Sequence, residues 1–175
     1  MDAHETAEVH HSPSSWQQPC PQPASAERTT LVEGIAERVL ALSPGRLLIG
    51  IDGFTAAGKT SFGHELAERV TKSGRPALRA TLDDFKNPWK DRHLYDRESG
   101  EGYYRNAYAY ETAKRLLLDP ARSPEATSCA LCSIDPLTQE NHAAQTTQLA
   151  EVDPLPRMDA VVDNRDFARP KLLTS

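Results

Sequence analysis

The apolar positions between residues 27 and 42 recur at spacings of three and four, which predicts a helix with one apolar face. The stripe consists of Leu31, Ile35, Val39 and Leu42. The same periodicity over residues 59–74 predicts a second helix, which Gly74 is expected to end. Between the two helices, Ser-Pro-Gly at 43–45 predicts a turn.

Two short apolar runs flank the second helix. Residues 46–52 (RLLIGID) and residues 76–85 (PALRATLDDF) are bounded by turn signals and therefore predict buried strands. Strand, loop, helix and strand in this order form a βαβ unit, which implies a parallel sheet with a right-handed crossover. We therefore expect an α/β fold.

The pattern is weaker beyond this unit. Residues 86–105 have no clear period and are rich in charged and aromatic residues, so we expect a long surface segment that carries substrate contacts. A short helix from residue 109 is predicted to stop before Pro120. Short strands are predicted in SCALCSI (128–134) and DAVVDN (159–164).

Composition divides the chain into a tail and one domain. Residues 1–26 are rich in proline, serine, glutamine and histidine, and they bury too little apolar area to offset the entropy of ordering. We expect a disordered tail there and a single domain over residues 27–175. The net charge of −5 argues against nucleic-acid or anionic-membrane partners. No apolar run approaches the ~20 residues that span a bilayer.

The three cysteines are Cys20, Cys129 and Cys132. An odd, small number without an N-terminal export signal predicts a cytoplasmic protein. Cys129 and Cys132 have the spacing of a metal or redox pair, but a zinc site needs about four ligands. Only His142 lies nearby in sequence, so buried thiols are expected instead.

Residues 53–60 match the phosphate-loop pattern G-x-x-x-x-G-K-[ST]. Glycines allow the backbone amides to surround an anion, and the following helix directs its positive end to the same point. The strand before and the helix after are the context that the pattern requires, so a three-layer αβα fold of the P-loop NTPase type is expected. Lys59 would contact the β- and γ-phosphates of ATP, and the Thr60 hydroxyl would bind Mg²⁺. The predicted cofactor-binding residues are Gly53, Phe54, Thr55, Ala56, Ala57, Gly58, Lys59, Thr60 and Ser61.

Asp83 and Asp84 close the second predicted strand. In parallel sheets, ligands bind beyond the carboxyl ends of the strands. Because side chains alternate along a strand, one carboxylate should face the site and the other its opposite side. The first could accept a proton from an attacking hydroxyl or orient Mg²⁺ through water. A helix N-cap or a solvated turn is the alternative.

Aromatic and basic residues follow in the next segment. Trp89, Tyr103 or Tyr104 could stack on a planar base, and Arg92, Arg97 or Arg105 could bind phosphates. An ordinary surface or packing role is the alternative for each of them.

Three segments together resemble the uridine kinase / phosphoribulokinase group of P-loop kinases, and more closely the bacterial uridine kinase-like proteins. They are IGIDGFTAAGKTSFGHELA (49–67), RATLDDF (79–85) and EGYYRNAYAYETAKRLLLDP (101–120). Two further segments, at 129–139 and 151–170, are also similar to parts of such proteins.

The resemblance implies phosphoryl transfer from ATP to a sugar hydroxyl of a small acceptor, such as the nucleoside uridine. It places Lys59 on the triphosphate and Asp83 in the position of the base that activates the acceptor. The implied substrate-binding residues are Asp84, Tyr104, Arg105 and Asn106. The family usually has aspartate where this chain has Asn106, which can accept one hydrogen bond but lacks the charge.

The resemblance also reveals a gap. Family members have an acid-bearing strand and a helical lid with arginines between the equivalents of Ala150 and Glu151. A sheet of this type needs about five strands, and the pattern here predicts fewer, so the fold is expected to be incomplete. Three functions remain open: an ATP-dependent nucleoside kinase, a nucleotide-binding remnant with little or no kinase activity, and a P-loop hydrolase or switch.

Overall fold

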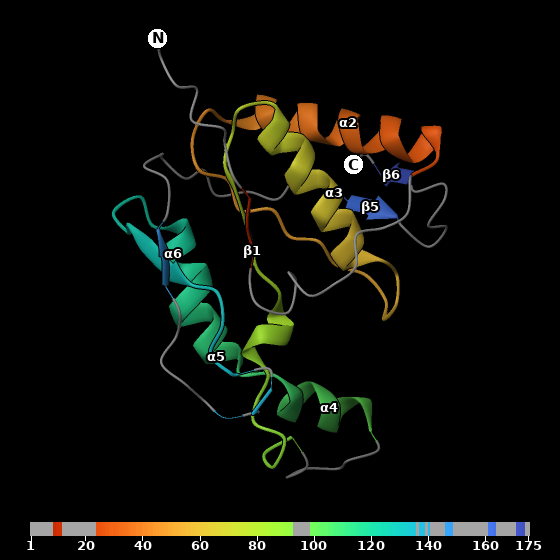
Figure 1. Cartoon of the computed structure of the whole chain (residues 1–175). Helices are drawn as coiled ribbons and strands as arrows, with labels where there is room; N and C mark the ends of the chain where they lie inside the picture. The colour runs from red at the N-terminus through yellow and green to blue at the C-terminus, as the bar shows by residue number, and fades with distance from the viewer. Residues whose placement is uncertain are drawn as a thin grey trace. The chain divides into compact units, whose positions relative to one another are not determined.

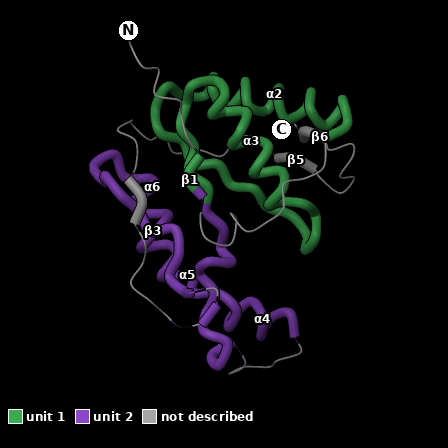
Figure 2. The backbone as a smooth tube through the Cα atoms, viewed as in Figure 1, with its two compact units in different colours: residues 1–10, 18–79, 152–175 green, residues 11–17, 80–151 purple. Residues whose placement is uncertain are grey.

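The computed structural model describes residues 9–11, 24–92, 99–135, 137–138, 140, 146–148, 161–163 and 171–173. They form a mixture of helices and short strands, which is compatible with the α/β class (Figure 1). The chain divides into two compact units, coloured separately in Figure 2. Unit 1 comprises residues 1–10, 18–79 and 152–175, and unit 2 comprises residues 11–17 and 80–151. The single domain expected over residues 27–175 stays a prediction.

Unit 1 contains both predicted helices, α2 (Ala26–Leu42) and α3 (Lys59–Lys72), which pack against each other (Figure 1). Gly74 follows α3 with φ +87, a left-handed conformation that glycine adopts without strain and that stops the helix as expected. The core residues between the helices are Val32, Ile35, Ala36, Val39, Phe62, Leu66 and Val70. The buried face of α2 is thus rotated from the expected stripe, because Val32 is buried and Leu42 is exposed.

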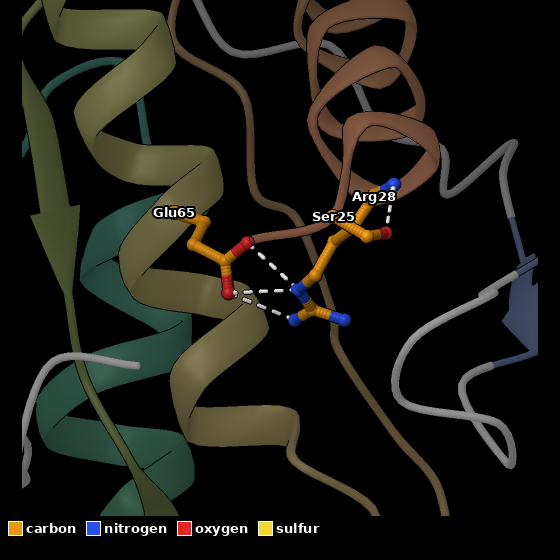
Figure 3. A network of polar contacts seen from close by, with 3 residues as sticks. All are labelled: Ser25, Arg28 and Glu65. Atoms are coloured by element: carbon orange, nitrogen blue, oxygen red, sulfur yellow. Dashed lines mark hydrogen bonds and ion pairs between the residues drawn. The ribbon is translucent and has the colours of Figure 1, made fainter. Parts of the chain in front are cut away.

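A buried ion pair joins the two helices near the start of α2 (Figure 3). The guanidinium of Arg28 donates to both carboxylate oxygens of Glu65, with Nε–Oε2 and Nη2–Oε1 distances of 2.8 Å. Ser25 caps α2 by accepting a hydrogen bond from the Arg28 amide at 3.2 Å. The sequence pattern did not indicate this pair, because its two residues lie 37 positions apart in the chain.

The strand predicted over residues 46–52 is wrong, because this run is irregular. A strand forms where a neighbouring strand satisfies its backbone groups. The expected neighbour, β2 (Ala77–Arg79), pairs instead with β1 (Val9–His11), a strand inside the predicted disordered tail. Leu47 packs on the helical core, whereas Ile49 and Ile51 are exposed. Most of the remaining tail lies outside the described residues.

The strand predicted over residues 76–85 forms only at β2. The 3₁₀ helix η1 (Leu82–Phe85) of unit 2 follows it, so Asp83 and Asp84 lie on a helical turn rather than at a strand end. Helix α4 (Gly100–Ala107) then occupies part of the segment that was expected to be irregular. It is capped by Ser99, whose hydroxyl accepts from the Gly102 amide at 2.9 Å.

The helix predicted to stop before Pro120 continues beyond it. It runs through α5 (Tyr110–Ala113), the π-helical turn η2 (Lys114–Leu118) and α6 (Asp119–Arg122). Proline cannot donate a backbone hydrogen bond, and it is tolerated in the first turn of a helix. The wide π turn ends just before Pro120, which lies in that first turn of α6 and does not break the helix.

The remaining strands are short. β3 (Ser128–Ala130) confirms part of the strand predicted over 128–134 and pairs antiparallel with β4 (Thr146–Gln148). β5 (Val161–Asp163) confirms the one predicted over 159–164 and pairs antiparallel with β6 (Lys171–Leu173). Cys129 and Cys132 are buried and form no disulfide, as expected. Among the described residues no helix has the length and apolar character needed to cross a membrane.

Candidate phosphate-binding loop and tyrosine cluster

The predicted phosphate loop is a tight, left-handed turn at the start of α3. Gly53, Ala56 and Gly58 have φ values of +148, +62 and +73. Such a conformation costs a non-glycine residue roughly 1–2 kcal/mol, so the loop retains a strained backbone at Ala56. The Ala57 amide donates to the carbonyl of Phe54 at 3.1 Å, which closes the turn.

Lys59 bends back over this loop. Its Nζ atom donates to the carbonyl oxygens of Gly53 and Phe54, both at 2.8 Å. The ammonium group therefore stays beside the loop backbone and at the positive end of α3. An ammonium has three donors, and the carbonyl groups occupy two of them. Lys59, the loop backbone and the N-terminal end of α3 thus form a positively charged region within unit 1.

The remaining loop side chains are exposed or half-buried. Phe54 is 80% exposed, and Thr60 and Ser61 are half-buried in the first turn of α3. Within the described residues, no group of three or more histidine, cysteine or acidic side chains could hold a metal ion. Mg²⁺ in nucleotide sites commonly uses one or two protein oxygens together with substrate phosphates and water. The hydroxyl of Thr60 fits that limited requirement.

The two acids of η1 differ in exposure. Asp83 is 50% exposed and forms an ion pair with Lys86, with an Oδ1–Nζ distance of 2.7 Å. Asp84 is 2% exposed, and its backbone carbonyl accepts a hydrogen bond from the Ser133 amide. Asp83 is therefore the accessible carboxylate of these two, and a substrate role for Asp84 stays a prediction.

Backbone hydrogen bonds fasten the segment after η1 to the end of α4. The Asn87 amide donates to the carbonyl of Ala107 at 3.0 Å, and the Ala109 amide donates to that of Phe85 at 2.8 Å. Lys86 forms a β-bridge with Tyr108 between these two bonds. The Asp83–Lys86 pair is thereby held beside a group of tyrosines.

This tyrosine cluster comprises Tyr103, Tyr104, Tyr108 and Tyr110, whose ring centroids lie between 5.2 and 6.0 Å apart in three successive pairs. Lys86 Nζ lies 5.9 Å from the centre of the Tyr108 ring, a cation–π distance. Tyr104 is 65% exposed, and Tyr103 is also exposed. Aromatic faces beside a charged pair are typical of sites for planar, polar ligands.

Burial raises the pKa of Tyr108 well above its usual value of about 10. The hydroxyl of Tyr103, 3.4 Å from that of Tyr108, and the negative charge of Asp83 act in the same direction. Burial also raises the pKa of Tyr110. These tyrosines are consequently neutral hydrogen-bonding groups throughout the physiological range.

The other predicted substrate residues lie on α4. Arg105 forms an ion pair with Glu101 one turn earlier. Asn106 accepts a hydrogen bond from the Asn87 side chain through its backbone carbonyl, and its own Nδ2 atom is buried without a partner among the described residues. Trp89 and Arg92 stack on each other, with Cζ 5.6 Å from the ring centre. Arg97 lies outside the described residues.

Sequence reasoning missed three residues of these sites. Lys86 could have been found from its i, i+3 spacing to Asp83. Tyr108 and Tyr110 were not singled out, because they lie where the sequence predicted the end of an irregular segment and the start of an ordinary helix. Comparisons of the chain with protein-family models, with curated proteins and with solved structures found no match.

Proposed function

We propose that this chain is an ATP-dependent kinase of the P-loop type that phosphorylates a hydroxyl of a small acceptor, most simply a nucleoside such as uridine. Residues 53–61 would hold the triphosphate, and Thr60 would bind Mg²⁺. The single observation that carries the proposal is Lys59, whose ammonium lies over a left-handed loop at the positive end of α3. The proposal includes a three-layer P-loop fold. The observed helices and small sheets are compatible with the α/β class to which that fold belongs.

The proposed reaction transfers the γ-phosphoryl group of ATP to the acceptor hydroxyl. The acceptor oxygen attacks the γ-phosphorus, the bond from that phosphorus to the β–γ bridging oxygen breaks, and ADP leaves. The acceptor proton passes to the Asp83 carboxylate, which is exposed and ion-paired rather than buried. Bound Mg²⁺ would neutralise charge on the phosphate oxygens. Tyr104, Arg105 and Asn106 would contact the acceptor.

The test is ADP release with and without uridine or cytidine. Lys59→Ala should abolish acceptor-dependent release, because the variant lacks the cation that is proposed to contact the β- and γ-phosphates. Lys72→Ala is a matched control, since Lys72 is an exposed lysine at the other end of the same helix. Acceptor-dependent release that Lys59→Ala leaves unchanged contradicts the proposal. Release that does not depend on any acceptor indicates a hydrolase or switch instead.

A second candidate function is nucleotide binding without turnover. It is favoured by the absence of a strand at 46–52 in the described structure, because such a strand would anchor the loop to a sheet edge. A loop without that anchor can still bind phosphate but positions it less rigidly for transfer. ATP binding without ADP release, in the same assay, identifies this case.

A further inference from the structure

Arg79, the last residue of β2, reaches α3 at Gly63. A Cβ atom at Gly63 would lie 2.9 Å from Nη2, 3.1 Å from Cζ and 3.2 Å from Nε of that guanidinium. The missing side chain at Gly63 therefore provides the space that the guanidinium fills. Because Cα–Cβ bonds in a helix tilt toward its N-terminus, this space lies over the first turn of α3.

The charge of Arg79 is not compensated within the described part of the chain. Its Nη1 atom is buried and makes no hydrogen bond. Burial lowers the pKa of Arg79, yet an arginine remains charged at neutral pH. The neighbouring Arg75 differs, since its guanidinium donates to the carbonyl oxygens of Ser43, at 2.7 Å, and Gly45.

Three physical effects act against this arrangement in the free protein. Partial burial removes water from a cation without supplying a partner. The positive N-terminal end of α3 also repels a cation held over its first turn. Lys59 adds a further positive charge at the same end. An anion bound at this end of α3 would relieve all three penalties at once.

We infer that Arg79 is a second cationic contact, beside Lys59, for the phosphate groups of a nucleoside triphosphate at the loop. This inference rests on the proposed function and deepens it. A guanidinium can donate paired N–H groups to two phosphate oxygens, which the ammonium of Lys59 cannot do. Gly63 then has a binding role, because it admits the guanidinium to the first turn.

The test uses thermal unfolding and calorimetry with inorganic triphosphate and with ATP, both in Mg²⁺. Arg79→Met should raise the Tm of the ligand-free protein, because it removes an uncompensated cation, and should weaken binding of both ligands by about 10- to 100-fold. Arg75→Met is the matched control. It should lower the ligand-free Tm, because satisfied hydrogen bonds are lost, and leave affinity unchanged.

Gly63→Ala is a second variant that keeps the charge. Alanine favours the helix and displaces only the flexible end of Arg79, so the variant should fold and bind both ligands more weakly.

Arg79→Met with wild-type affinity overturns the inference, even if Lys59→Ala shows that the loop binds ATP. Equal losses in Arg79→Met and Arg75→Met, each with a lower Tm, overturn it as well. ATP binding that depends on Arg79, without acceptor-dependent ADP release, retains the inference and contradicts the proposed function. Binding of neither ligand overturns both.

Discussion

The hydroxyl of Tyr108 in the tyrosine cluster should make the stability of this chain depend on pH in the alkaline range. The pKa of Tyr108 is raised in the folded protein, so folding favours its neutral form. The resulting stabilisation is fully present below the unfolded pKa of about 10 and is lost as pH rises beyond it. The free energy of unfolding should therefore fall above pH 10.

Tyr108→Phe should make that fall shallower, because phenylalanine has no proton to lose. Urea unfolding at pH 8 and above pH 10 measures the difference. In an alkaline titration followed by tyrosine absorbance, the variant should lack the ionisation step that occurs at the highest pH in the wild type. Tyr104→Phe removes another ring of the same cluster and serves as a control, since Tyr104 is largely exposed. An identical decline in wild type and Tyr108→Phe would show that the hydroxyl is not responsible.

Residue identity alone also explains how far the phosphate site could be predicted. Gly53, Gly58 and Lys59 belong to a pattern whose proposed role depends on backbone freedom and charge, so the sequence alone singles them out as candidates. The sequence did not indicate Arg79 as a phosphate contact, because that proposed role depends on the space that the missing side chain of Gly63 provides. That proximity arises from the packing of β2 on α3, which no local pattern encodes.

At the scale of elements, the contact between α2 and α3 depends on a buried charge as well as on apolar packing. Arg28 is 1% exposed and Glu65 is 17% exposed. Removing one member of such a pair leaves the other buried and unpaired, which typically costs about 3–5 kcal/mol. Arg28→Met should therefore lower the free energy of unfolding by roughly that amount.

The double variant Arg28→Met, Glu65→Met should recover most of this loss, since no charge remains unpaired. Urea unfolding of the two single variants and the double variant completes a mutant cycle. The exposed pair between Arg69 and Glu33 is the control, and its removal should cost about 1 kcal/mol or less. A loss that the double variant does not recover would mean that packing, rather than charge, dominates at this position.

The elements divide clearly into those the sequence predicts and those it does not. Helices α2 and α3 were predicted, because a helix satisfies its own backbone and needs only one apolar face. The run at 46–52 was misjudged, because an apolar strand requires a partner and β2 pairs with β1. Pro120 was misjudged because the π turn before it places the proline where a helix tolerates it.

At the scale of the whole molecule, the two candidate sites belong to different compact units. Lys59 and Arg79 lie in unit 1, whereas Asp83 and the tyrosine cluster lie in unit 2. ATP binding and acceptor binding should therefore respond to different substitutions. Tyr104→Ala should raise the KM for uridine by about 10-fold or more, the typical effect of losing a stacking partner, while the Kd for ATP stays unchanged.

Steady-state kinetics and calorimetry on the same preparation measure the two constants. Trp89→Ala is a control, because Trp89 is exposed and stacks on Arg92 outside the tyrosine cluster. Equal changes of both constants in Tyr104→Ala would indicate a general loss of structure rather than a separate acceptor site.

The most direct test of the central claim is calorimetric titration of magnesium-ATP into the full chain and into Lys59→Ala and Lys72→Ala. The loop geometry predicts saturable binding by the wild type and by Lys72→Ala, and no detectable binding by Lys59→Ala. The absence of heat from folded wild-type protein, or equal affinity in all three proteins, would contradict a phosphate-binding role for residues 53–61.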